Sequence, residues 1–136
     1  MRTVHYRWLA VLWTAGIVVA MSIPTGNLGN IQPALGFDKL IHALLFGGFG
    51  GLWLRGLCPP ANGTRTTCFY RRGGLFFVGG VLFAGGTEVY QYVLPVERVA
   101  DPYDMLADLT GFALAFIGYY AFYVWRPLQT SGKGEG

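Results

Sequence analysis

The sequence predicts an all-α integral membrane protein, a four-helix bundle with both termini on the cytoplasmic side. Of its 136 residues, 53% are hydrophobic and only 12% are charged, whereas about 25% of the residues in soluble domains are charged. Four apolar segments approach the roughly 20 residues needed to cross a bilayer. Lys and Arg are distributed unevenly among the connections, which predicts the orientation. The length suits a single domain, residues 1–136.

Four predicted spans divide the chain, at about residues 8–23, 38–57, 73–94 and 104–125. Pro24 follows the first span and Pro127 follows the fourth. Proline disrupts a helix interior, so these two spans are predicted to end before them. The first span follows Arg2 and Arg7, as a signal peptide would. Its apolar run is long, however, and no small-residue cleavage site follows it, so we favour an uncleaved helix. Residues 127–136 are expected to form a disordered tail.

The basic residues predict the orientation. Eight of the ten lie before the first span, around the connection between the second and third spans, or after the fourth: Arg2, Arg7, Arg55, Arg65, Arg71, Arg72, Arg126 and Lys133. Short loops rich in Lys and Arg stay in the cytoplasm. The cytoplasm keeps thiols reduced, so Cys58 and Cys68 in the central loop are predicted to form no disulfide. A zinc site needs four ligands, and because this loop contains no histidine none is predicted there.

Most of the acidic residues are predicted at the opposite, outer end. Six of the seven lie there: Asp38, Glu88, Glu97, Asp101, Asp104 and Asp108. Charge at membrane depth is costly and usually has a partner or a function. Asp38 and His42 are four residues apart and share a helix face, as do Asp104 and Asp108. Glu88 and Gln91, three residues apart, share a face of the third span. We therefore predict that the second, third and fourth spans direct polar faces into one cavity. Its candidate ligand-binding residues are Asp38, Lys39, His42, Glu88, Gln91, Arg98, Asp101, Asp104 and Asp108.

The residue types in this cavity leave several functions open. Lys39 and Arg98 can neutralise two carboxylates, and a divalent cation could neutralise others. The sequence does not identify a particular cofactor or a particular set of metal ligands. His42 is a candidate general acid or base, with Glu88 or Asp108 as its partner or as a metal ligand. The nucleophile and metalloprotease motifs G-x-S-x-G and H-E-x-x-H are absent from the sequence, so enzyme activity stays undecided.

Two further interpretations give the polar residues other roles. An interhelical network could serve the bundle alone, and Asp101 and Asp104 could cap the fourth helix. Ion-coupled transport would require more than four helices, and so a homodimer. The basic loops contain no nucleic-acid recognition motif.

The polar residues also form an ordered set of short motifs. These are Asp38-Lys39-Leu40-Ile41-His42, then Glu88-Val89-Tyr90-Gln91, then Arg98 followed by Asp101, Asp104 and Asp108. In this order, across about residues 35–120, they resemble the VanZ-like family of bacterial integral membrane proteins. Many relatives carry Asn where this chain has Asp108, which adds a negative charge here.

The resemblance implies a multi-pass protein of the bacterial inner membrane, linked to the cell envelope and to resistance against glycopeptides such as teicoplanin. It names no reaction. Together with the polar residues, it predicts a binding site for a lipid head group or a lipid-linked envelope precursor at the outer leaflet. The alternative is a membrane enzyme that acts on such a substrate by His/carboxylate or metal-assisted chemistry.

Overall fold

The computed structural model describes residues 2–22, 35–59, 65–93 and 102–125, and nearly all of them are helical. The elements are α1 (Arg2–Ser22), α2 (Leu35–Leu57), α3 (Arg65–Cys68), η2 (Phe69–Gly73), α4 (Gly74–Val93), α5 (Pro102–Tyr119) and η3 (Tyr120–Trp125). The all-α prediction is confirmed. Four helices are long and apolar enough to cross a membrane, as in a multi-pass membrane protein. Their orientation stays a prediction, and the expected tail after residue 126 lies outside the described residues.

The segment before α4 differs from the prediction. Residues 58–72 were expected to form a polar loop, but Arg65–Cys68 is α-helical and Phe69–Gly73 is a π-helical turn that leads directly into α4. The ring of Phe69 stacks on Tyr119 at 6.0 Å and lies 5.5 Å from Tyr120. This aromatic contact favours order in a segment whose arginines and threonines suggested a loop.

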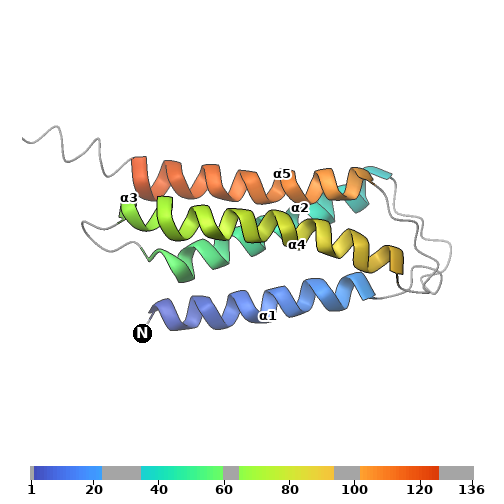
Figure 1. Cartoon of the computed structure of the whole chain (residues 1–136), viewed down its shortest axis with the longest axis horizontal. Coiled ribbons are helices and arrows are strands. Elements are labelled where there is room, and N and C mark those ends of the chain that lie inside the picture. The colour runs from blue at the N-terminus through green and yellow to red at the C-terminus, as the bar shows by residue number, and fades with distance from the viewer. Residues whose placement is uncertain (1, 23–34, 60–64, 94–101, 126–136) are drawn as a thin grey trace, which may run out of the picture.

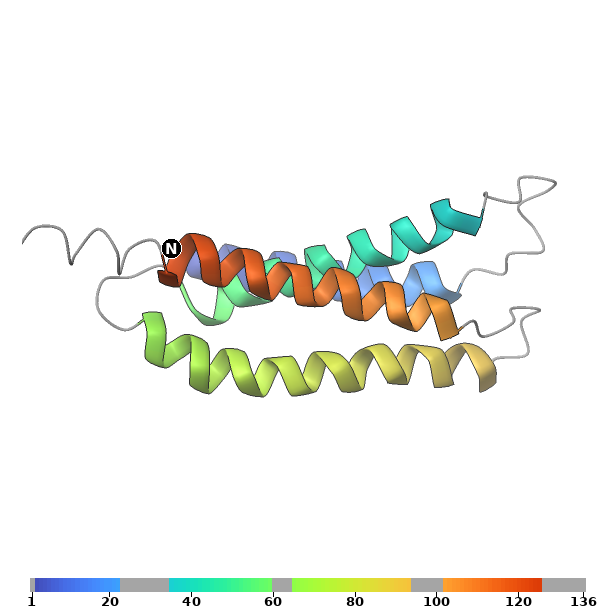
Figure 2. The ribbon, with the colours of Figure 1, turned by 90° about the horizontal axis from the view of Figure 1, so that it is seen from above.

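The four long helices run along one axis of the molecule. The start of α1 and the end of the last helical segment lie at the same end of the bundle (Figure 1). α2 and α5 form the most extensive pair, α1 packs on α2, and α4 makes fewer contacts with α5 and α1. Seen from above, α4 is set apart from the other three helices (Figure 2). The α2–α5 pair is therefore the centre of the fold.

Glycine allows the close approach of α2 and α5. A Cβ atom added to Gly111 would overlap the backbone carbonyl of Ala43, and one added to Gly47 would lie 3.4 Å from the carbonyl oxygen of Gly111. Small residues at helix contacts permit such close backbone approach. A Cβ atom on Gly51, one turn after Gly47, would meet nothing within 4 Å, so Gly51 is not needed for the close approach of the two helices.

Aromatic rings fill the space between α4 and the central pair. Phe49 of α2 lies 5.4 Å from Phe76 and 5.2 Å from Phe83 of α4, measured between ring centroids. Phe112 of α5 lies 5.5 Å from Phe76. Such ring pairs combine buried apolar area with favourable edge and offset geometries. The packing of α4 thus depends on side chains, whereas α2 and α5 meet at the backbone.

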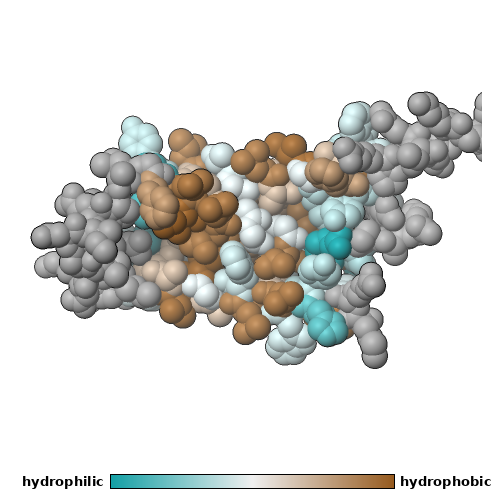
Figure 3. Space-filling model, turned by 180° about the vertical axis from the view of Figure 1, so that it is seen from behind, coloured by the Kyte–Doolittle hydropathy of each residue, from teal (hydrophilic) through white to brown (hydrophobic). Residues whose placement is uncertain are grey.

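The surface is divided along the helix axis. Figure 3 shows hydrophobic residues across the middle of one face and hydrophilic residues towards the ends. Large apolar side chains point outwards from different helices, among them Leu12, Leu82 and Leu114. An apolar exterior this extensive is unusual for a soluble monomer and fits contact with lipid.

Cys58 and Cys68 form a disulfide in this structure, with their Cα atoms 5.7 Å apart. The prediction of two free thiols is therefore wrong. The backbone N–H of Cys58 continues the helical pattern by donating to the carbonyl of Leu54 at 2.8 Å, and the Tyr119 hydroxyl donates to the carbonyl of Cys58. The disulfide holds the end of α2 beside α3, and the Tyr119 hydrogen bond holds the same end beside α5. Disulfides persist in oxidising compartments, whereas the surrounding arginines favour the cytoplasm, so the two features favour opposite orientations.

Candidate functional site

The candidate site lies where α2 and α5 begin. The polar cluster consists of Asp38, Lys39 and His42 from the first two turns of α2 and Asp104 and Asp108 from the first two turns of α5. The four-residue spacing places Asp38 and His42 on one face of α2, and Asp104 and Asp108 on one face of α5. Ala43 and Gly111, where the two backbones meet, lie next to the cluster in sequence. The helix crossing therefore holds these two polar faces together.

The innermost members of the cluster are His42 and Asp108. His42 Nδ1 lies 2.9 Å from Asp108 Oδ1, and the two residues are only 3% and 0% exposed. With an ionised carboxylate, Nδ1 carries the proton and donates it to Oδ1. This contact fixes the orientation of the imidazole. Its other nitrogen, Nε2, is then the ring atom that could bind a ligand or a metal ion.

One oxygen of Asp108 has no partner in the part of the chain that the structure describes. Oδ2 is buried and receives no hydrogen bond there. Buried carboxylate oxygens without donors are costly and uncommon. Asp108 therefore offers an acceptor that a hydroxyl, an amine or a cation could satisfy.

A second pair lies nearer the surface. Lys39 Nζ is 3.1 Å from Asp104 Oδ1, and the two side chains are 27% and 12% exposed. The same ammonium lies 5.6 Å from the centroid of the Tyr103 ring, within the range of a cation–π interaction. Tyr103 was not among the predicted site residues; its position directly before Asp104 was the available signal.

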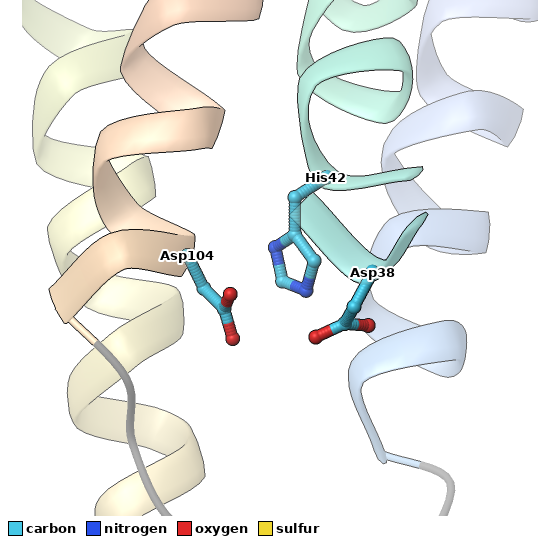
Figure 4. Close-up of side chains that lie close together, drawn as sticks. All are labelled: Asp38, His42 and Asp104. Carbon is cyan, nitrogen blue, oxygen red and sulfur yellow. The ribbon is translucent and has the colours of Figure 1, made fainter. Parts of the chain in front are cut away.

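Three members of the cluster have the spacing of metal ligands. One ligand atom each from Asp38, His42 and Asp104 lies within 4.8 Å of the others, and Figure 4 shows the imidazole between the two carboxylates. Bonds of roughly 2.0–2.6 Å from one ion could span this spacing. A metal-bound histidine usually donates its other N–H to a carboxylate, as His42 can donate to Asp108. Against this fit, Lys39 already neutralises one oxygen of Asp104.

Two of the predicted site residues, Glu88 and Gln91, belong to α4. Gln91 is buried and its Nε2 donates to the sulfur of Met21 in α1 at 3.3 Å, so it connects α4 to α1. Glu88 is half-buried and is not part of the metal-spaced group. Arg98 and Asp101 lie outside the described residues, as does Glu97. Of the three helix faces predicted to meet, the described contacts join those of α2 and α5.

The cluster is rich in negative charge. Its three carboxylates outnumber Lys39 and His42 even when the imidazole is protonated. Opposite charge or proton donors stabilise such an arrangement. The cluster is therefore suited to a ligand with an amine, hydroxyl groups or a bound divalent cation.

No family model matches the chain, and no curated protein or solved structure matches it at the significance threshold applied.

Proposed function

We propose that this chain is a VanZ-like protein of the bacterial inner membrane whose polar cluster binds the head group of a lipid or of a lipid-linked envelope precursor. Binding would change the availability of that lipid and so the sensitivity of the envelope to glycopeptides. The observation that carries the proposal is Asp108, fully buried in an apolar span and with one carboxylate oxygen that has no hydrogen-bond partner among the described residues. Intramembrane carboxylates of this kind commonly serve function.

The charge of the cluster favours particular head groups. An amine or a hydroxyl can donate to a carboxylate oxygen, and the excess of carboxylates attracts the amine. A phosphate would need a cation beside it, either the ammonium of Lys39 or a bridging divalent ion. Arg98 is the other candidate for phosphate, because its planar guanidinium donates two parallel hydrogen bonds. The resemblance to the VanZ-like motifs supports an envelope ligand.

A second candidate function is metal-assisted chemistry on such a lipid. It is favoured by the spacing of Asp38, His42 and Asp104 and by the carboxylate of Asp108 behind the imidazole. A divalent ion held there would polarise a phosphoryl oxygen or lower the pKa of a bound water. In this function Asp108 orients His42, and Glu88 remains a candidate from sequence.

Native mass spectrometry of the protein extracted in mild detergent tests both functions. The wild type is compared with Asp104→Asn, which removes one charge from the cluster at nearly constant size. Glu135→Gln is the matched control, because Glu135 is the one acidic residue predicted outside the polar end. We expect a retained lipid on the wild type and the control, and about tenfold less on Asp104→Asn, as loss of about 1.4 kcal/mol of binding implies.

Elemental analysis of the same samples separates the two functions. A stoichiometric divalent metal that is lost in Asp104→Asn supports metal-assisted chemistry, and lipid retention without metal supports simple binding. If none of the three proteins carried a bound lipid or metal and Asp104→Asn were only less stable, both functions would be contradicted. That result would support a structural polar network.

A further inference from the structure

A second feature lies towards the opposite end of the bundle, where the arginines gather. A cavity of about 470 Å³ opens between α1, α2 and α4, within the roughly 300–1,000 Å³ typical of ligand sites. Phe49, Phe76 and Phe83 form much of its wall, and Arg72 lies at one end. From Arg72 to Phe83 it extends about 16 Å along the helix, at 1.5 Å per residue. We name it the chain cavity.

The interior of the chain cavity offers little to a polar ligand. Its lining includes a hydroxyl and an indole N–H, from Thr14 and Trp53. The indole donates to the Thr14 hydroxyl at 3.0 Å, and this hydroxyl donates to the carbonyl of Ala10 at 2.7 Å. Both groups are thus already paired. An apolar occupant therefore suits the cavity.

The end of the chain cavity is different, because it joins a second, more polar hollow. Leu57, Arg72 and Leu75 line both cavities. The second has a volume of about 660 Å³, and Arg71 and Thr67 also line it. Both arginines are exposed, and within the described ranges no carboxylate lies in salt-bridge distance of either. The hollow thus presents two positive charges at the mouth of an apolar cavity.

We propose that this pair of cavities binds one anionic membrane phospholipid, with an acyl chain in the chain cavity and its phosphate at Arg71 and Arg72. The proposal concerns a site separate from the polar cluster and does not depend on the function proposed there. Charge complementarity identifies the occupant: guanidinium groups bind phosphate oxygens through paired hydrogen bonds, and the apolar cavity excludes a free polar anion. Anionic lipids also concentrate near clusters of basic residues.

The test is a lipid titration followed by native mass spectrometry of the purified full-length protein. The probes are dioleoyl phosphatidylglycerol and dioleoyl phosphatidylcholine, which share their chains and differ in net charge. We expect the wild type to bind phosphatidylglycerol about fivefold more tightly, because one basic group near a membrane surface is worth about 1 kcal/mol. Arg72→Gln should lose this preference.

A matched pair of glycine substitutions tests the chain cavity at constant charge. A Cβ atom at Gly79 or at Gly86, both on α4, would meet nothing within 4 Å, and of these two only Gly79 lines the chain cavity. Gly79→Leu should fill it and lower phosphatidylglycerol binding about tenfold, while Gly86→Leu should bind as the wild type does.

Two results would overturn the proposal. Equal binding of the two lipids by the wild type would contradict selection of an anionic lipid by the arginines. Unchanged phosphatidylglycerol binding by Gly79→Leu, with inorganic phosphate displacing the lipid, would show surface attraction to the head group without chain insertion. Equal melting temperatures of Gly79→Leu and Gly86→Leu guard against misfolding as the cause of a loss.

Discussion

The two ends of the bundle handle charge in opposite ways. At the end where α2 and α5 begin, ionisable side chains pair across the helix interface: His42 with Asp108 and Lys39 with Asp104. At the other end, Arg55 lies 5.0 Å from the ring of Tyr6 and 4.6 Å from that of Tyr123. Ion pairs at one end are thus replaced by aromatic faces at the other.

The helix packing near each end differs accordingly. Beside the polar cluster, Gly111 lets the backbones of α5 and α2 touch. Towards the basic end, Phe69 and Tyr119 stack, and a disulfide joins Cys58 to Cys68. Where the two backbones touch, a wider helix separation lengthens the polar contacts directly, whereas aromatic rings lie between the helices at the other end. The polar cluster should therefore be the end most sensitive to helix spacing.

The largest effect is expected at the glycine crossing. Gly111→Ala should destabilise the protein by about 3 kcal/mol, because the new methyl overlaps the backbone of Ala43 and forces α2 and α5 apart. Gly118→Ala on the same helix meets nothing within 4 Å and serves as control. Denaturation in detergent measures both. Equal stability of the two variants would contradict the importance of close backbone contact.

A loss of similar size is expected when the buried pair is broken. Either His42→Leu or Asp108→Leu alone should cost about 3 kcal/mol, because each leaves a buried polar group without its partner. The double variant should recover much of this loss. Lys39→Leu, in the more exposed pair, should cost below about 1 kcal/mol. A double-mutant cycle measures the coupling, and additive losses would contradict direct pairing in the folded protein.

The smallest of the three effects is expected at the basic end. Replacing Cys58 and Cys68 together by serine should lower the free energy of unfolding by about 2 kcal/mol, because it removes a cross-link between residues ten apart. Lipid retention at the polar cluster should not change. Intact mass under non-reducing conditions shows whether the bond forms in cells, and thiols found free there would support a cytoplasmic loop.

The side of the membrane that the basic end faces can be measured directly. The arginines and the disulfide favour opposite sides of the membrane for the same loop. Labelling an introduced cysteine from outside intact cells, in the Cys58→Ser/Cys68→Ser background, would decide between them. Labelling at the basic end would reverse the predicted N-in/C-in arrangement and place the polar cluster on the cytoplasmic side.

The sequence by itself determined the four spans and the residue types at each end. Span length and apolar composition are local properties, so counting along the chain located all four helices. Most helix ends lie within about three residues of the predicted ones, but α1 begins at Arg2 rather than near residue 8. The charges within apolar spans were also visible directly. Glu88 and Asp108 were recognised as candidates for this reason, since charge is costly at membrane depth.

Only the tertiary structure decided which of these groups are partners. His42 pairs with Asp108, whereas Gln91, expected in the same cavity, donates to Met21 of α1. The disulfide was missed because a compartment argument says nothing about two Cα atoms 5.7 Å apart. Partner choice depends on how closely and at what rotation the helices pack, and this is set by contacts such as Gly111 on Ala43 between residues far apart in the chain.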